Sequence, residues 1–172
     1  MEQFLGFFVA PVFVGFLQAT TRLAIPILLD ALGGMFAERA GVLNIGLEGM
    51  MLTGAFVGFV TAFLTGNLWY GVLVGTISGG ALGLFLAFYT VTLGTNQVVA
   101  GIAFNLLMVG VTSFAYRAVF GMGTETQRIN SFATLPVPYL SDIPILGPLL
   151  FQQTAFVYLA LLLVPATWLV IS

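Results

Sequence analysis

The sequence predicts an all-α fold, a polytopic bundle of transmembrane helices with about five spans in 172 residues. Three observations predict it. Hydrophobic residues make up 60% of the chain and charged residues only 6%, whereas soluble domains are about 45–50% apolar and about 25% charged. Several apolar stretches reach about 20 residues, the length of helix that crosses a bilayer core of about 30 Å. The links between most of them are short, which suits antiparallel neighbouring helices.

The residue types that the sequence lacks exclude most enzyme chemistries. Without Cys or His it offers no thiol nucleophile, no imidazole base and no usual zinc or haem ligand. Without Lys it cannot complete a Walker-type phosphate loop. The net charge of -2 argues against a nucleic-acid partner. We therefore expect a non-enzymatic membrane protein that binds no metal and takes its energy from a partner or a gradient.

The first apolar stretch, residues 4–36, is too long for one straight span. Pro26, Asp30 and the adjacent Gly33 and Gly34 give it places to bend or stop. We expect about one span here, ending in a polar turn.

That turn carries the adjacent opposite charges Glu38 and Arg39. Two interpretations stay open for this pair. The charges either mark a membrane boundary, where both remain solvated, or contact a cytoplasmic subunit.

Four further stretches predict spanning helices, namely residues 44–64, 68–92, 97–118 and 154–172. The second of these carries small residues at a spacing of four, and the helix before it has a similar notch. Small residues at this spacing let two helix backbones approach closely in lipid, so we expect a packing seam. The seam residues are Gly54, Gly58, Gly71, Gly75, Gly79 and Gly83.

In the helix predicted from residue 44, Asn44 and Glu48 lie four residues apart and hence on one face. An acidic side chain turned toward lipid at mid-depth costs roughly 2.5–3.5 kcal/mol, so Glu48 should face protein or a wet cavity. A structural ion pair or helix cap and a place on a translocation path both remain open for Glu48.

The helix predicted at 97–118 has a polar stripe within about 100° of arc on a helical wheel. Uncharged amides and hydroxyls on one face suit recognition of a neutral polar solute, and they equally suit hydrogen bonds between helices. Both interpretations stay open. The stripe consists of Gln97, Gly101, Asn105, Met108, Thr112 and Tyr116.

The segment 120–153 cannot be one helix, because repeated prolines remove amide donors and restrict the residues before them. We expect an exposed loop with a short interfacial or re-entrant piece. It serves either as a connector or as a surface that docks a partner or covers a pore. The prolines are Pro136, Pro138, Pro144 and Pro148.

Two strings in the chain resemble a family signature. The first is ERAGVLNIGLEGMM at residues 38–51, followed by TGAF at 53–56, and the second is TNQVVAGIAFNLL at residues 95–107. The sequence thereby resembles the permease subunits of bacterial ATP-binding-cassette importers for nucleosides and simple sugars, in the branch linked to basic-membrane-lipoprotein binding proteins. The resemblance covers nearly the whole chain and is strongest over residues 26–121. Family permeases are longer, so the chain resembles an N-terminal portion of one.

The resemblance implies that residues 1–172 are one permease domain in the bacterial cytoplasmic membrane. It implies four kinds of partner: a second permease subunit, a cytoplasmic subunit that binds the ATP, an extracytoplasmic solute-binding lipoprotein and the lipid bilayer. Transport of a nucleoside or simple sugar would follow alternating access, with segment 120–153 outside the cell and Glu38 and Arg39 inside. The candidates for lining or supporting the path are Asn44, Glu48, Asn96, Gln97, Asn105 and Thr112.

Two alternatives remain open. A secondary carrier or channel would couple transport to protons or cations through the intramembrane carboxylates Asp30 and Glu48. In a purely structural membrane subunit, the polar stripe would only join helices.

Overall fold

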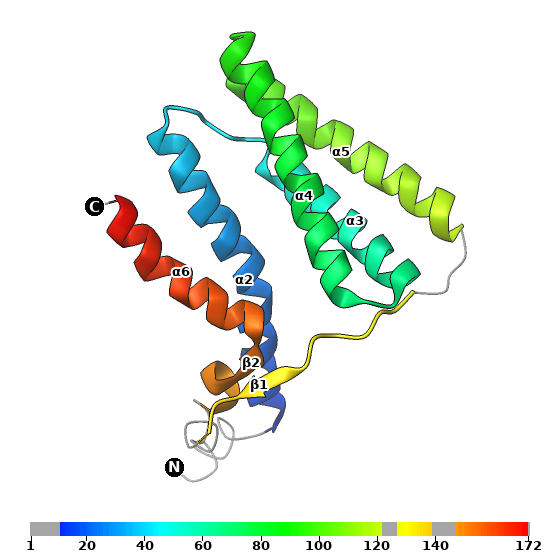
Figure 1. The fold of residues 1–172 in the computed structure, drawn as a ribbon, viewed down its shortest axis with the longest axis vertical. Helices are drawn as coiled ribbons and strands as arrows, with labels where there is room; N and C mark the ends of the chain where they lie inside the picture. The colour runs from blue at the N-terminus through cyan, green and yellow to red at the C-terminus, as the bar shows by residue number, and fades with distance from the viewer. Residues whose placement is uncertain (1–10, 122–126, 139–146, 172) are drawn as a thin grey trace. The chain divides into compact units, whose positions relative to one another are not determined.

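The computed structural model describes residues 11–121, 127–138 and 147–171, and its elements are labelled in Figure 1. Helices dominate these ranges. The elements are α2 (Pro11–Arg39), α3 (Leu47–Thr65), α4 (Leu68–Ala87), the π-helical turn η1 (Phe88–Thr92), α5 (Gln97–Phe120), β1 (Thr134–Pro136), the π-helical turn η2 (Gly147–Phe151), β2 (Gln152–Thr154) and α6 (Ala155–Ile171).

Among the described residues, four helical segments are long and apolar enough to cross a bilayer, and α6 is a shorter apolar helix. Every apolar stretch identified in the sequence contains a helix within the described residues, which confirms the predicted fold class. Residues 4–10 and 172, at the ends of the first and last stretches, lie outside them. At most 22% of the most apolar window of any of the four segments is buried within the protein. The remaining apolar surface therefore requires lipid or other protein around it. The four segments are Val12–Arg39, Leu47–Thr65, Leu68–Thr92 and Gln97–Phe120.

Threonine hydroxyls on these helices bond to their own backbone. Each donates to the carbonyl oxygen four residues earlier, at 2.6–3.1 Å. The hydroxyl hydrogen therefore has an acceptor even where the helix is surrounded by apolar groups. The residues are Thr20, Thr21, Thr53, Thr61, Thr65, Thr76, Thr90 and Thr112.

The chain divides into two compact units. One unit comprises residues 1–33 and 132–172, and the other comprises residues 34–131. The larger unit contains α3, α4 and α5 side by side (Figure 1). Its core is formed by Leu86, Phe104 and Met108, which are buried.

In the unit of residues 1–33 and 132–172, α2 packs on α6 through Ile25, Val157 and Ala160. The strands β1 and β2 pair antiparallel, with Leu135 opposite Gln153.

Gln153 is fully buried and joins these elements. Its Oε1 accepts from Arg22 Nε at 3.4 Å, and its Nε2 donates to the Leu149 carbonyl at 3.0 Å. The Tyr158 hydroxyl donates to the Leu135 carbonyl at 2.9 Å.

Within the segment 120–153 that the sequence predicts as a loop, the described residues after Phe120 form only short elements, namely β1, η2 and most of β2. Three residue pairs form although Pro136 has no amide hydrogen, and beyond it the Val137 amide donates to the Phe151 carbonyl at 2.9 Å. A three-residue strand carries no alternating pattern that sequence analysis can detect. The predicted loop also includes residues 122–126 and 139–146, which lie outside the described residues.

Four of the predicted seam glycines bring the α3 and α4 backbones together. A Cβ atom built on Gly71 would lie 2.6 Å from the carbonyl oxygen of Gly58, and one on Gly75 would lie 2.8 Å from that of Gly54. Real Cβ contacts do not come this close, so both positions require glycine. At Gly79 the nearest contact would be 3.8 Å, an ordinary van der Waals distance.

The sixth seam glycine, Gly83, also lies outside the tight contact. A Cβ there would lie 3.6 Å from Met50 Sδ. The two helices therefore approach closely only along the N-terminal half of α4.

Replacing Gly75 with Ala should destabilise the protein by about 1–3 kcal/mol, because the new methyl group forces two backbones apart. Gly80→Ala on the same helix is the matched control, since nothing lies within 4 Å of its Cβ position. The control should be neutral or gain up to about 1 kcal/mol from better helix propensity. Unfolding in detergent, followed by helical circular dichroism, measures both. Equal stabilities of the two variants would contradict the close contact.

Candidate functional site

The candidate site is the non-helical segment 40–46 between α2 and α3, together with the face of α5 that packs on it. Helix α2 ends at a left-handed glycine, Gly41, with φ of 78°. The Gly41 amide donates to the Glu38 carbonyl at 2.9 Å, and the Val42 amide donates to the Ala37 carbonyl at 3.0 Å. Beyond this point the backbone needs hydrogen-bond partners from outside its own helix.

Two amide side chains of α5 provide those partners. Gln97 Oε1 accepts from the Leu43 amide at 2.7 Å. Asn105 Nδ2 donates to the Ile45 carbonyl at 2.8 Å, and Asn105 Oδ1 accepts from the Gly49 amide at 2.8 Å. We call this pair of side chains the amide clamp. It holds segment 40–46 and the first turn of α3 against α5.

Gly101 lies between the two clamp residues and allows the close approach. A Cβ atom at this position would lie 2.8 Å from Ile45 Cβ and 3.1 Å from the Gly46 amide nitrogen. The polar stripe of α5 therefore has a local physical explanation: two amides two turns apart, with a buried glycine between them. The two sequence strings at 38–51 and 95–107 meet here as one structural unit.

Asn96 and Thr112 form their hydrogen bonds within α5. The Asn96 side chain caps the helix by accepting from the Val98 and Val99 amides at 3.0 and 3.1 Å. Thr112 is buried, and its hydroxyl donates to the Met108 carbonyl at 2.6 Å.

Asn44 does not lie on one helical face with Glu48, which corrects the prediction. Helix α3 begins at Leu47, because the clamp holds the preceding backbone in a non-helical path. Asn44 is half-buried, and its Nδ2 makes a long contact of 4.0 Å with Met50 Sδ. Its Oδ1 is buried and has no hydrogen-bond partner among the described residues.

Glu48 lies in the first turn of α3, where the helix dipole favours a negative charge. Its side chain is exposed and forms no ion pair or hydrogen bond within the described ranges. Asp30, the other carboxylate of the carrier alternative, lies in the unit of residues 1–33 and 132–172. Glu38 and Arg39 are both exposed in the last turn of α2, so the helix extends through the predicted turn.

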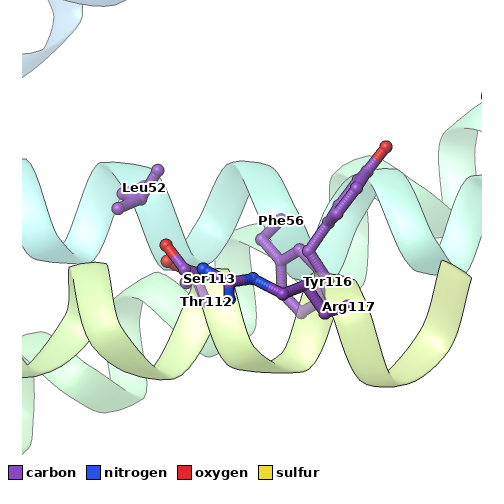
Figure 2. A pocket seen from close by; sticks show the side chains of 6 residues that line it. All are labelled: Leu52, Phe56, Thr112, Ser113, Tyr116 and Arg117. Atoms are coloured by element: carbon purple, nitrogen blue, oxygen red, sulfur yellow. The ribbon is translucent and has the colours of Figure 1, made fainter. Parts of the chain in front are cut away.

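A hollow of about 380 Å³ lies between α3 and α5 (Figure 2). Sequence reasoning missed it, although an arginine within an apolar span was an available signal. The two helices contribute apolar, aromatic, hydroxyl and cationic side chains: Leu52, Phe56, Thr112, Ser113, Tyr116 and Arg117. No group of three or more carboxylate, His or Cys side chains within the described residues could hold a metal ion.

The chain matches a protein family described as branched-chain amino acid transport system / permease component over residues 16–172. It is 44% identical over 158 residues to a putative glucose ABC transporter permease protein of Haloferax volcanii, an alignment that covers 90% of this chain and 46% of the relative. It is 33% identical to a guanosine ABC transporter permease protein of Bacillus subtilis over 160 residues, covering 89% of this chain and 50% of the relative.

A third relative is a nucleoside ABC transporter permease protein of Lactococcus lactis, 31% identical over 153 residues, with 85% of this chain and 48% of the relative covered. The chain therefore spans about half the length of the curated relatives it matches. No solved structure matches the chain.

Replacing Asn105 with Leu should destabilise the protein, because the Gly49 amide and the Ile45 carbonyl both lose their partner. Gly49 is buried, and a buried polar group left unsatisfied costs about 1–3 kcal/mol, whereas Ile45 is exposed and loses less. Ser113→Ala is the control on the same helix, since the exposed Ser113 makes no hydrogen bond within the described part of the chain. Chemical unfolding in detergent should separate the two variants. An N105L protein as stable as S113A would refute the clamp.

Proposed function

The chain belongs to the family of permease components of branched-chain amino acid type transport systems, and from this membership we propose that it acts in an ATP-driven importer for a nucleoside or simple sugar. The importer moves this neutral polar solute across the cytoplasmic membrane by alternating access. The observation that carries the proposal is the match over residues 16–172, together with relatives named as glucose, guanosine and nucleoside permeases. The apolar helices make the chain a multi-pass membrane protein.

In the proposed assembly, each subunit has a different function. A cytoplasmic subunit binds and hydrolyses ATP, an extracytoplasmic lipoprotein delivers the solute, and a second permease completes the path. This chain contributes membrane helices and no covalent catalysis. Closure of the ATP-binding subunits would switch the helices between outward and inward openings.

The hydrogen bonds inside the candidate site suggest two different roles for the path candidates. Asn96, Gln97, Asn105 and Thr112 already use side-chain atoms in bonds to the backbone, so they support the path by holding its shape. Gln97 and Asn105 hold segment 40–46 in place, while Asn96 and Thr112 bond within α5.

Asn44 and Glu48 are the candidates for direct contact with the solute. Both carry oxygen acceptors without a partner among the described residues. Sugar hydroxyls and nucleobase amino groups are donors, so acceptors at this position match the chemistry of a nucleoside or simple sugar. A bound solute would also satisfy the buried Asn44 Oδ1.

The alternative is a secondary carrier or channel coupled to protons or cations through Asp30 and Glu48. No observation favours it, and the named relatives are ABC transporter permease proteins.

In proteoliposomes that contain the complete importer, uptake of labelled nucleoside or glucose should require both ATP and the binding lipoprotein. Omitting either should abolish uptake, because the permease has no energy source of its own. Uptake driven by a pH or sodium gradient without ATP would contradict the importer and support the carrier.

Replacing Glu48 with Ala should raise the KM for uptake by about 10–100-fold, because hydrogen bonds to charged groups contribute about 1.5–3 kcal/mol. Glu38→Ala is the matched control, since Glu38 is an exposed glutamate at the end of α2. Its KM should stay at the wild-type value. Equal KM values in the two variants would remove Glu48 from the solute path.

A further inference from the structure

Arg117 is the one charged residue of α5, and its side chain has no partner in the part of the chain that the structure describes. It lies in the last turn of α5, is exposed, and makes no side-chain hydrogen bond or ion pair within residues 11–121, 127–138 and 147–171. A guanidinium in a membrane-spanning segment is stable where it reaches water or an anion. The question is which anion is available to it.

The surroundings place Arg117 near the end of the membrane-crossing segment. Phe120 ends α5 and contacts Phe63 in the last turns of α3, with ring centroids 5.2 Å apart. The polar turn at residues 65–67 follows directly. Arg117 lies three residues before Phe120, a distance of about 4.5 Å along the helix axis. Its long side chain can therefore reach the headgroup level.

The hollow beside Arg117 has a polar part and an apolar part. Figure 2 shows the Arg117 side chain extending along α5 toward Ser113, whose hydroxyl is a second donor. Leu52 and Phe56 of α3 line the same hollow and offer an apolar wall. Leu52 is 39% exposed, so this wall is open to the surroundings of the helix pair.

We propose that this hollow binds a phospholipid of the surrounding bilayer. The phosphodiester accepts hydrogen bonds from the Arg117 guanidinium and the Ser113 hydroxyl, and an acyl chain lies along Leu52 and Phe56. Guanidinium groups bind phosphate oxygens in a forked geometry, and phosphates are the anions that a bilayer presents at this depth. The apolar wall distinguishes a lipid from free phosphate, which has no apolar part to place there.

The charge argues for lipid over the transported solute. A neutral solute can accept hydrogen bonds from the guanidinium but leaves its charge uncompensated, whereas a phosphodiester accepts the same bonds and also neutralises the charge. The residues that line the hollow include neither the amide clamp nor Glu48, and the Thr112 hydroxyl is already bonded to the Met108 carbonyl. The proposal therefore goes beyond the importer function and does not rest on it.

The test measures lipid binding to the complete permease in detergent by native mass spectrometry. Phosphatidylglycerol and phosphatidylcholine are titrated separately, because both carry the phosphodiester. Wild-type protein should bind both lipids, and Arg117→Gln should raise their Kd at least about tenfold, the loss of one charge-assisted bond. Arg39→Gln, which removes an exposed arginine in the last turn of α2, should leave both Kd values unchanged.

Two further arms identify the source of the anion. Diacylglycerol, which lacks the phosphate, should not bind at this site, and inorganic phosphate should not displace bound lipid. Displacement by inorganic phosphate at equal concentration would show a free anion site and overturn the proposal. Lipid affinity that is the same in R117Q and wild type would overturn it as well.

A second variant keeps the proposal testable if R117Q does not fold. Leu52→Ser leaves the cation in place and removes part of the apolar wall, so it should weaken lipid binding severalfold. If Leu52→Ser leaves the lipid Kd unchanged, the hollow does not bind lipid. If either variant raises the KM for solute and leaves lipid binding unchanged, the hollow binds solute instead.

Discussion

The structure depends on one constraint: backbone polar groups among apolar helices need partners inside the protein. Most of the described chain meets this constraint by being helical. Segment 40–46 cannot, and the amide clamp of Gln97 and Asn105 supplies the missing partners. The break in the chain and the polar residues on α5 are therefore two parts of one solution. Without the break, Asn44 would lie on a helix, and its oxygen would not be held beside the first turn of α3.

The lipid surroundings also explain why the helices pack closely. In lipid, apolar side chains gain little by meeting one another, so van der Waals contact between backbones becomes important. Gly54, Gly58, Gly71 and Gly75 permit that contact between α3 and α4. Gly101 plays the equivalent part between α5 and segment 40–46. Glycine thus acts at two different interfaces, one between helices and one between a helix and an irregular backbone.

Polar side chains in the other unit serve the same principle. The fully buried Gln153 bonds to Arg22 of α2 and to the Leu149 carbonyl, while Tyr158 of α6 bonds to β1 through Leu135. These bonds join the short strands to two apolar helices. Arg117 differs from Arg22, because its side chain has no such partner among the described residues. The proposed partner of Arg117 is therefore a phospholipid of the surrounding bilayer.

Local patterns were sufficient to predict the class of protein and the approximate bounds of its apolar helices, because length and hydropathy are local properties. They also identified the family, since both signature strings are contiguous. The remaining features depend on contacts between residues that are distant in the sequence. Leu43 and Gln97 are 54 positions apart, and their bond helps to place Asn44 outside α3, although the local pattern continues the helix. The same holds for three other features, each of which forms only where separate segments meet. They are the close glycine contacts between α3 and α4, the β1–β2 pairing and the hollow at Arg117.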